Sequence, residues 1–168
     1  MELLPDYLQP GLDIVFMGAA PSLKAAETGH YYAGSRNRFW LLLHQSGLTS
    51  RLLDSSEDRT VLQYGIGLTA IFKNQISSDN AGLPEPSSEQ RKIVHDKLLS
   101  YNPKIVCFNG KDVYRMFYGE DAPRWGLLTE SFGESLQFVV HSSSGRADRW
   151  GADRLHLYKE LAGLARDE

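Results

Sequence analysis

The sequence predicts an α/β fold, a three-layer αβα sandwich with a central, mainly parallel four-stranded sheet. Short apolar segments of strand length alternate along the chain with segments of helical periodicity, and this alternation is typical of parallel sheets covered by helices. Two of the apolar segments end in loops of small residues, at 18–22 and 141–146. In open α/β sheets, ligands bind beyond the carboxyl ends of the strands. We therefore expect these two loops to form opposite walls of one site.

Four apolar runs bounded by turn residues are the predicted strands. The first is residues 13–17, and Gly, Pro and Ser follow it at once. The second is residues 65–72 and is weakened by its glycines, the third is residues 104–108, and the fourth ends at Val140. Mostly apolar strands of this kind are expected where helices cover both faces of the sheet.

Helical periodicity links the predicted strands. Phe39, Leu42 and Leu43 share one face at i, i+3, i+4 spacing. Ser87 and Gln90 form a capping-box pattern at the start of a longer helix. The predicted helices are residues 37–46, 57–64, 87–101, 111–118 and 152–165.

Composition limits the class of protein. The 168-residue chain, with 42% hydrophobic and 23% charged residues, is expected to form one domain over residues 1–168. The longest apolar run is too short to cross a membrane, and the first residues lack a signal-peptide pattern, so we expect no membrane partner. The single cysteine, Cys107, fits a cytoplasmic location. Cys-x-x-Cys and His-x-x-x-His pairs are missing from the sequence, which argues against a metal site. The net charge of −3 argues against a strongly basic coat but leaves a local basic face open.

Five short motifs carry a family resemblance. They are residues 18–22 (Gly-Ala-Ala-Pro-Ser), 37–40 (Asn-Arg-Phe-Trp), 65–69 (Gly-Ile-Gly-Leu-Thr), 108–111 (Phe-Asn-Gly-Lys) and 142–146 (Ser-Ser-Ser-Gly-Arg). In this order and spacing, over nearly the whole chain, they resemble the mismatch-specific uracil (thymine) DNA glycosylases of the uracil-DNA glycosylase superfamily. The resemblance implies a monomeric enzyme without metal or cofactor. Its partner would be DNA containing uracil or another damaged base, which it flips out and removes to leave an abasic site.

One departure concerns the water that attacks the sugar. In the usual family motif, Gly-Ile-Asn-Pro-Gly, the Asn holds this water, and here that position is Ala20. A related alternative places a carboxylate just after the Leu-Thr of the second strand, and here that position is Ala70. Loss of a positioned base typically costs about 10²–10⁴ in rate. We therefore expect a slower enzyme, or one whose water-positioning group lies elsewhere.

The resemblance assigns the base pocket to two loops and two strand ends. Tyr32 matches the aromatic ring that stacks on the flipped base, and its alternative is a plain core tyrosine. Backbone N–H groups of Ala19, Ala20 and Tyr32 can stabilise the departing base anion. Asn109 can instead bond to neighbouring loops. The predicted base-binding residues are Gly18, Ala19, Ala20, Pro21, Ser22, Tyr32, Thr69 and Asn109.

The last loop is predicted to contact DNA. Gly145 and Arg146 match the wedge that fills the gap left by the flipped base, and Arg146 can alternatively clamp a phosphate. Serine hydroxyls and a lysine are expected to hold phosphates nearby. The predicted DNA-binding residues are Lys111, Ser142, Ser143, Ser144, Gly145 and Arg146.

Two residues are candidates for the missing catalytic group. His141 stands at the head of the last loop, where it can donate to the base or serve as a structural hydrogen bonder. Asp79 lies in the polar connection after the second strand and can hold water or stabilise the sugar cation, or be a solvated loop acid. We expect Cys107, Trp40 and Trp125 to be core or packing residues.

Three functions remain open from the sequence. The first is a monofunctional uracil-DNA glycosylase. The second is a glycosylase for another deaminated base, such as hypoxanthine or xanthine. The third, motivated by Ala20 and Ala70, is a catalytically weak binder of damaged or abasic DNA. A nucleotide-binding α/β protein is disfavoured because the sequence lacks a Gly-x-Gly-x-x-Gly pattern.

Overall fold

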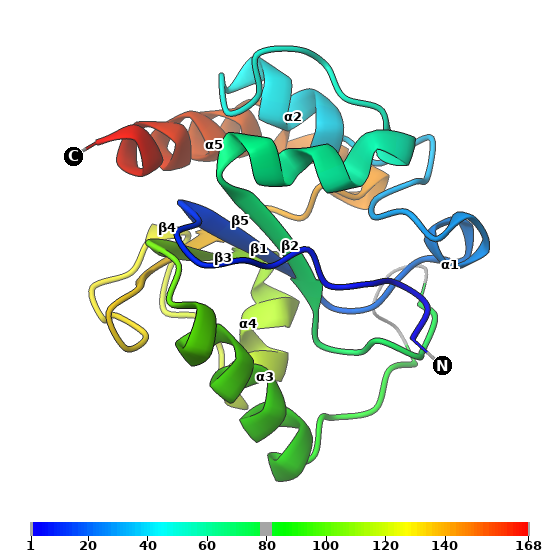
Figure 1. Cartoon of the computed structure of the whole chain (residues 1–168), viewed down its shortest axis with the longest axis vertical. Helices are drawn as coiled ribbons and strands as arrows, with labels where there is room; N and C mark the ends of the chain where they lie inside the picture. Colours follow the sequence, from blue (N-terminus) through cyan, green and yellow to red (C-terminus); the bar gives the residue numbers. More distant parts are fainter. Residues whose placement is uncertain (1, 78–81, 168) are drawn as a thin grey trace.

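The computed structural model describes residues 2–77 and 82–167. Its centre is a five-stranded sheet in the order β2-β1-β3-β5-β4 (Figure 1). The strands are β1 (Ile14–Gly18), β2 (Ile66–Ala70), β3 (Ile105–Asn109), β4 (Gly126–Leu127) and β5 (Leu136–Val140). Neighbouring strands are parallel, except that β4 is antiparallel to β5. The predicted mainly parallel α/β fold is confirmed. The predicted number of strands is one too few, because two-residue β4 is too short to show a sequence pattern.

Helices cover both faces of the sheet. Figure 1 shows α3 and α4 on one face, and α2 and α5 on the other. The helices are α1 (Leu23–Thr28), α2 (Phe39–Gln45), α3 (Ser88–Tyr101), α4 (Lys111–Tyr118) and α5 (Gly151–Arg166), with 3₁₀ helices η1 (Ser55–Tyr64) and η2 (Gly145–Trp150). Within residues 2–77 and 82–167, no helix has the length and apolarity needed to cross a membrane.

Strand β1 divides the core into two layers. Successive strand side chains point to opposite faces, so Ile14 and Phe16 join the cluster beneath α2 and α5. Val15 and Met17 join the cluster beneath α3 and α4. Phe16 makes an edge contact with Phe39, with ring centroids 5.0 Å apart. Because both faces are covered, the strand is a continuous apolar run, as the sequence predicts.

The long helix begins where the sequence predicts, but only one of the two hydrogen bonds of the capping box forms. Ser87 is the N-cap of α3, and its hydroxyl accepts a hydrogen bond from the Gln90 backbone N–H at 3.0 Å. The Gln90 side chain does not return to the cap. Its Nε2 donates to the Ile71 carbonyl at 2.7 Å, so this residue ties α3 to the segment after β2.

The strand order determines where a ligand can bind. From β1 the chain passes to β2 on one side, and from β2 it crosses to β3 on the other side of β1. The loops after β1 and β3 therefore diverge at a topological switch point, which is where open α/β sheets bind ligands. The loop after β5 lies beside the loop after β3, because β5 pairs with β3 in parallel.

Candidate active site

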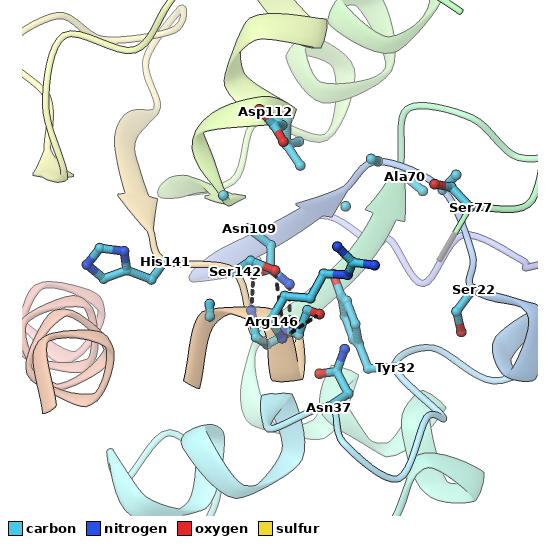
Figure 2. Close-up of a pocket in the computed structure, with 18 of the residues that line it drawn as sticks. Ser22, Tyr32, Asn37, Ala70, Ser77, Asn109, Asp112, His141, Ser142 and Arg146 are labelled. Carbon is cyan, nitrogen blue, oxygen red and sulfur yellow. Dashed lines mark hydrogen bonds between the residues drawn. The ribbon is translucent and has the colours of Figure 1, made fainter. Parts of the chain in front are cut away.

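A cavity of about 630 Å³ opens beyond the carboxyl ends of β1, β3 and β5. Figure 2 shows Tyr32, Asn109 and Arg146 near its centre, with Ser22 on one side and His141 on the other. The lining residues come from all the predicted loops. They are Leu4, residues 18–22, Ala25, Tyr31, Tyr32, Asn37, Ala70, Ser77, residues 109–113, Trp125, residues 141–144, Arg146, Ala147, Arg149, Trp150 and Asp153.

The loop after β1 is held by its own carbonyl groups. The Gly18 carbonyl accepts a hydrogen bond from Ile71 N–H at 2.9 Å, and the Ala19 carbonyl accepts one from Phe72 N–H at 2.8 Å. The Pro21 carbonyl accepts one from Ser77 N–H at 3.0 Å. The segment after β2 thus fixes this wall of the cavity through backbone contacts, which do not depend on the side chains at positions 19 and 20.

Ser22 has a structural partner at the end of the same loop. Its side chain accepts a hydrogen bond from Ala25 N–H at 3.1 Å and is the N-cap of α1. The hydroxyl therefore ends the loop and begins a short helix that the sequence analysis did not predict. Because the oxygen acts as an acceptor in this cap, its own hydrogen is left to donate toward the cavity.

Tyr32 lies on the floor of the cavity in a strained backbone conformation. Its φ of 53° places a non-glycine residue in the left-handed region. Its hydroxyl is buried without a hydrogen-bond partner of normal geometry. Burial raises the pKa of Tyr32 to about 12, although the nearby Asn109 side chain acts to lower it. A Cβ on Gly18 would lie 3.1 Å from this hydroxyl oxygen, so the glycine gives the tyrosine its space. Local strain with an unsatisfied polar group is typical of functional positions.

Asn109 joins the end of β3 to the loop after β5. Its Oδ1 accepts a hydrogen bond from Ser143 N–H, and its Nδ2 donates to Ser143 Oγ, both at 3.0 Å. The Ser143 carbonyl in turn accepts from Arg38 N–H at 2.8 Å. Asn109 lines the cavity, but both of its polar atoms are used to shape the opposite wall.

A buried arginine holds the rest of that wall. Arg154 is 4% exposed and its guanidinium donates to the Ser142 and Ser144 carbonyls at 3.0 and 3.2 Å. It also pairs with Asp148 at 3.1 Å. Ser144 is the N-cap of η2, where its hydroxyl accepts from Arg146 N–H. The loop is therefore a polar network built on α5, and it presents Arg146 to the cavity.

His141 lies between two tryptophan rings. Its ring centroid is 4.0 Å from that of Trp125 and 5.4 Å from that of Trp150, whose plane is nearly parallel to it. Burial is the main cause that lowers the pKa of His141, so the neutral imidazole is favoured at neutral pH. Figure 2 shows the imidazole directed away from Tyr32 and Arg146.

Two comparisons with known proteins bear on this arrangement. The family model of the uracil DNA glycosylase superfamily matches residues 5–162. The chain belongs to the uracil DNA glycosylase superfamily. In fold it is similar to a Methanosarcina acetivorans protein, provisionally named a uracil DNA glycosylase, whose structure was solved in solution by NMR. That likeness covers 95% of this chain and 96% of the other, with a TM-score of 0.62 and 20% sequence identity.

Superfamily membership implies a glycosylase that hydrolyses N-glycosyl bonds, with DNA as its substrate. The cavity lies where such a substrate is expected, and most of the predicted site residues line it. Both alanines that replace the usual water-positioning groups, Ala20 and Ala70, are among the lining residues. No group of three or more His, Cys, Asp or Glu residues that can hold a metal ion occurs in the described part of the chain.

Two of the predicted site residues that the structure describes do not line the cavity, and a third lies outside the described part of the chain. Thr69 is fully buried, and its hydroxyl donates to Asp6 Oδ1 at 2.7 Å, so it anchors the N-terminal segment to β2. Gly145 lies against Arg36, whose Cβ would be 3.0 Å from a Cβ at position 145. Asp79 lies outside the residues that the structure describes, and its role stays a prediction.

Polar residues that the sequence did not point to as site residues also reach the cavity. Asn37 and Asp112 both line it, and Figure 2 places Asn37 next to Tyr32, with Asp112 on the far side of Asn109. Asn37 Oδ1 accepts a hydrogen bond from Phe39 N–H at 3.0 Å at the start of α2. Asp112 is in the first turn of α4. Both stand at a predicted helix start, which is equally typical of capping residues. Asn37 also belongs to the 37–40 motif, but that motif carried no assigned role.

The three residues expected in the core differ in their exposure to solvent. Cys107 is fully buried and Trp40 is 7% exposed, as predicted. The prediction for Trp125 was wrong, because it is 39% exposed at the mouth of the cavity. Trp125 directly precedes β4, and its ring contacts His141, with centroids 4.0 Å apart, and Lys111 at 4.4 Å.

Proposed function

We propose that this chain is a monofunctional DNA glycosylase that flips uracil out of DNA and hydrolyses its N-glycosidic bond to leave an abasic site. The main support is the cavity at the strand ends, with a strained aromatic residue, Tyr32, on its floor. The motifs and their order in the sequence resemble those of the mismatch-specific branch of the superfamily, which also supports this proposal. The protein would act as a cytoplasmic monomer without a cofactor.

In the proposed reaction the C–N bond breaks first. The electron pair leaves with the base, the sugar becomes an oxocarbenium ion, and water adds to the sugar and gives up a proton. Backbone N–H groups of Ala19, Ala20 and Tyr32 would stabilise the base anion, because fixed donors act on charge that develops in the transition state. The Tyr32 ring would stack on the base and hold it out of the helix.

The attacking water needs an acceptor for orientation. Asn37 and Asp112 are polar side chains that line the cavity with Ala20 and Ala70. Asn37 Oδ1 already accepts one backbone N–H, which fixes the amide and leaves one lone pair and two donors. We place the water-positioning role on Asn37 first and on Asp112 second. His141 remains a weaker candidate because its imidazole is directed away from Tyr32.

A second candidate substrate is a deaminated purine, hypoxanthine or xanthine. The two alanines support it, because a methyl group at positions 20 and 70 leaves room where larger side chains would otherwise stand. A bicyclic base fills more of a cavity of this size than uracil does. The third candidate, a weak binder of abasic DNA, is distinguished by the same experiment.

Single-turnover excision tests this proposal. Oligonucleotides would carry uracil opposite G, opposite A or in single strand, with hypoxanthine and xanthine in parallel, and alkali would reveal abasic sites. We expect cleavage of at least one base, reduced about 10²–10⁴-fold in the variant that loses the water-positioning group. The variants are Asn37→Ala, Asp112→Ala, His141→Ala, Asp79→Ala and the gain-of-function Ala20→Asn.

Lys92→Ala is the matched control, because Lys92 is exposed on α3, away from the cavity. Cleavage that survives in every variant would support catalysis by backbone donors alone. No cleavage of any base, together with tight binding to abasic DNA, would contradict the enzyme and leave a lesion-binding protein.

A further inference from the structure

Two exposed tryptophans stand at the mouth of the cavity. Trp125 and Trp150 are 39% and 42% exposed, and both line the cavity that holds Tyr32. They come from separate segments, just before β4 and at the end of η2. Exposed apolar patches rimmed by polar residues mark interaction sites, and two large rings at one cavity mouth are a candidate for such a patch.

A buried histidine sets the orientation of both rings. His141 is 6% exposed at the end of β5, and its ring lies 4.0 Å from Trp125 and 5.4 Å from Trp150 by centroid distance. The planes of His141 and Trp150 differ by 4°. Rings held in place by such contacts lose little conformational freedom when a ligand stacks on them, which favours binding.

Two cations lie over the same tryptophans. Lys111 Nζ is 4.4 Å from the ring centroid of Trp125, and Arg149 Cζ is 5.2 Å from that of Trp150. We call Trp125, Trp150, His141, Lys111 and Arg149 the tryptophan ledge. An exposed cation–π contact is weaker than the stacking of a base on an aromatic ring. A base can therefore displace either cation, and the released cation can contact a phosphate.

The chemistry of the ledge fits one class of ligand. Its cations repel a positively charged ligand, so the two rings do not form a cage for an ammonium group. Flat rings beside positive charge match a strand that carries both bases and phosphates. The bases of a duplex are already stacked on one another, so only unpaired bases have a free face to offer.

We propose that the tryptophan ledge stacks unpaired bases that flank the damaged nucleotide, so that the protein engages single-stranded or locally opened DNA. This inference rests on the proposed function in one respect, namely that the bound single strand is DNA. It adds a second stacking site, separate from Tyr32, and it explains why His141 is directed toward the tryptophans rather than toward the floor of the cavity.

Binding of undamaged DNA tests the ledge without any need for turnover. Fluorescence anisotropy would compare a labelled oligodeoxythymidine with a duplex of the same length. We expect Trp125→Ala and Trp150→Ala each to weaken single-strand binding about tenfold and to change duplex binding less than about twofold. Phenylalanine at either position should keep affinity within about threefold, because it retains a ring for stacking.

Ile93→Ala is the matched control, because Ile93 is 52% exposed on α3 and is not among the residues that line the cavity. Lys111→Ala and Arg149→Ala should weaken both forms of DNA and flatten the salt dependence of binding, because each removes a phosphate contact. Lys92→Ala is the control for loss of an exposed charge.

Intrinsic fluorescence supplies a second measurement. The chain has three tryptophans, and Trp40 is buried, so quenching by a single strand would report on the ledge. We expect quenching in the wild type and its loss in the Trp125→Phe/Trp150→Phe variant, which keeps the packing.

Unchanged single-strand affinity in the alanine variants, or an equal loss for duplex and single strand, would overturn the ledge. The outcome is separate from that of the excision assay. A protein that cleaves no base but loses single-strand affinity in these variants would retain the ledge and lose only the proposed activity.

Discussion

The two walls of the cavity look alike in sequence but are built differently. Residues 18–22 and 141–146 are both small-residue loops that follow a buried strand. The first is fixed by three backbone carbonyls that bond to the segment after β2. The second is fixed by side chains, chiefly Asn109 and Arg154. A wall held by backbone contacts tolerates changes in its own side chains, whereas a wall held by buried side chains depends on each of them.

The largest effect is expected at Arg154, which supports the wall after β5. Arg154→Met keeps much of the apolar stem but leaves the Ser142 and Ser144 carbonyls without their donor. Hydrogen bonds to a charged group contribute about 1.5–3 kcal/mol each, so we expect a loss of about 3 kcal/mol in the free energy of unfolding. Urea denaturation would measure it. Arg51→Met is the control, because its ion pair with Glu57 is on the surface and is worth about 0–1 kcal/mol. Equal losses in the two variants would contradict the difference between the walls.

Asn109→Ala should have the next largest effect. It removes both hydrogen bonds to Ser143 and leaves a buried backbone N–H unsatisfied, so we expect a loss of about 2 kcal/mol in unfolding free energy. A double-mutant cycle with Ser143→Ala would isolate the Nδ2–Oγ contact. If the two losses were fully additive, the contact would have no energetic weight and the wall would be held by other groups.

Tyr32→Phe should stabilise the protein rather than destabilise it, and it tests the contact between Tyr32 and the wall after β1. The hydroxyl is buried without a partner, so its removal should raise the free energy of unfolding by about 1 kcal/mol. Gly18→Ala should be tolerated better in the Tyr32→Phe background, because the oxygen 3.1 Å from the added Cβ is then gone. Thermal denaturation of the two single variants and the double variant measures both effects. A destabilised Tyr32→Phe variant would mean that the hydroxyl has a stabilising partner.

A smaller loss is expected for Ser22→Ala. Ser22 caps α1 by accepting a hydrogen bond from Ala25 N–H at 3.1 Å, and loss of such a cap costs about 1 kcal/mol. Ser22→Asn is the conservative control, since asparagine is an equally good cap. Chemical denaturation would compare them, and equal stability of Ser22→Ala and the wild type would show that the backbone contacts alone hold this end of the loop.

The smallest expected effect is a change of stability with pH, which should arise from the wall after β5 and not from the wall after β1. Burial lowers the pKa of His141, against Asp153, which raises it; Arg154 and Lys111 also lower it. The unfolded chain therefore binds a proton more readily than the folded one, and stability should fall as the pH drops below the ordinary histidine pKa of about 6.5. Residues 18–22 contain no titratable side chain. The wild type should thus lose more stability than His141→Phe between about pH 7 and pH 5. Parallel pH profiles would contradict a neutral, buried imidazole.

Local patterns carried most of the fold prediction. The apolar runs that became β1 and β3 are continuous because helices cover both sheet faces, and a pattern of that kind is visible without any tertiary contact. Gln90 shows the limit of such patterns. Its position matches a capping box, yet its side chain donates to Ile71, a residue from another part of the chain. A local motif predicts which residues can bond to each other, and packing decides which partner is nearer.

The sequence by itself determined the α/β class, the strand-end location of the candidate site, the superfamily motifs and the alanines at positions 20 and 70. These follow from residue type and spacing along the chain. Only the tertiary structure decided that Thr69 bonds to Asp6, that Asn109 is used by Ser143, and that His141 lies between Trp125 and Trp150. Each of these contacts joins different elements of the chain, so the direction of each side chain depends on how the helices and loops pack over the sheet.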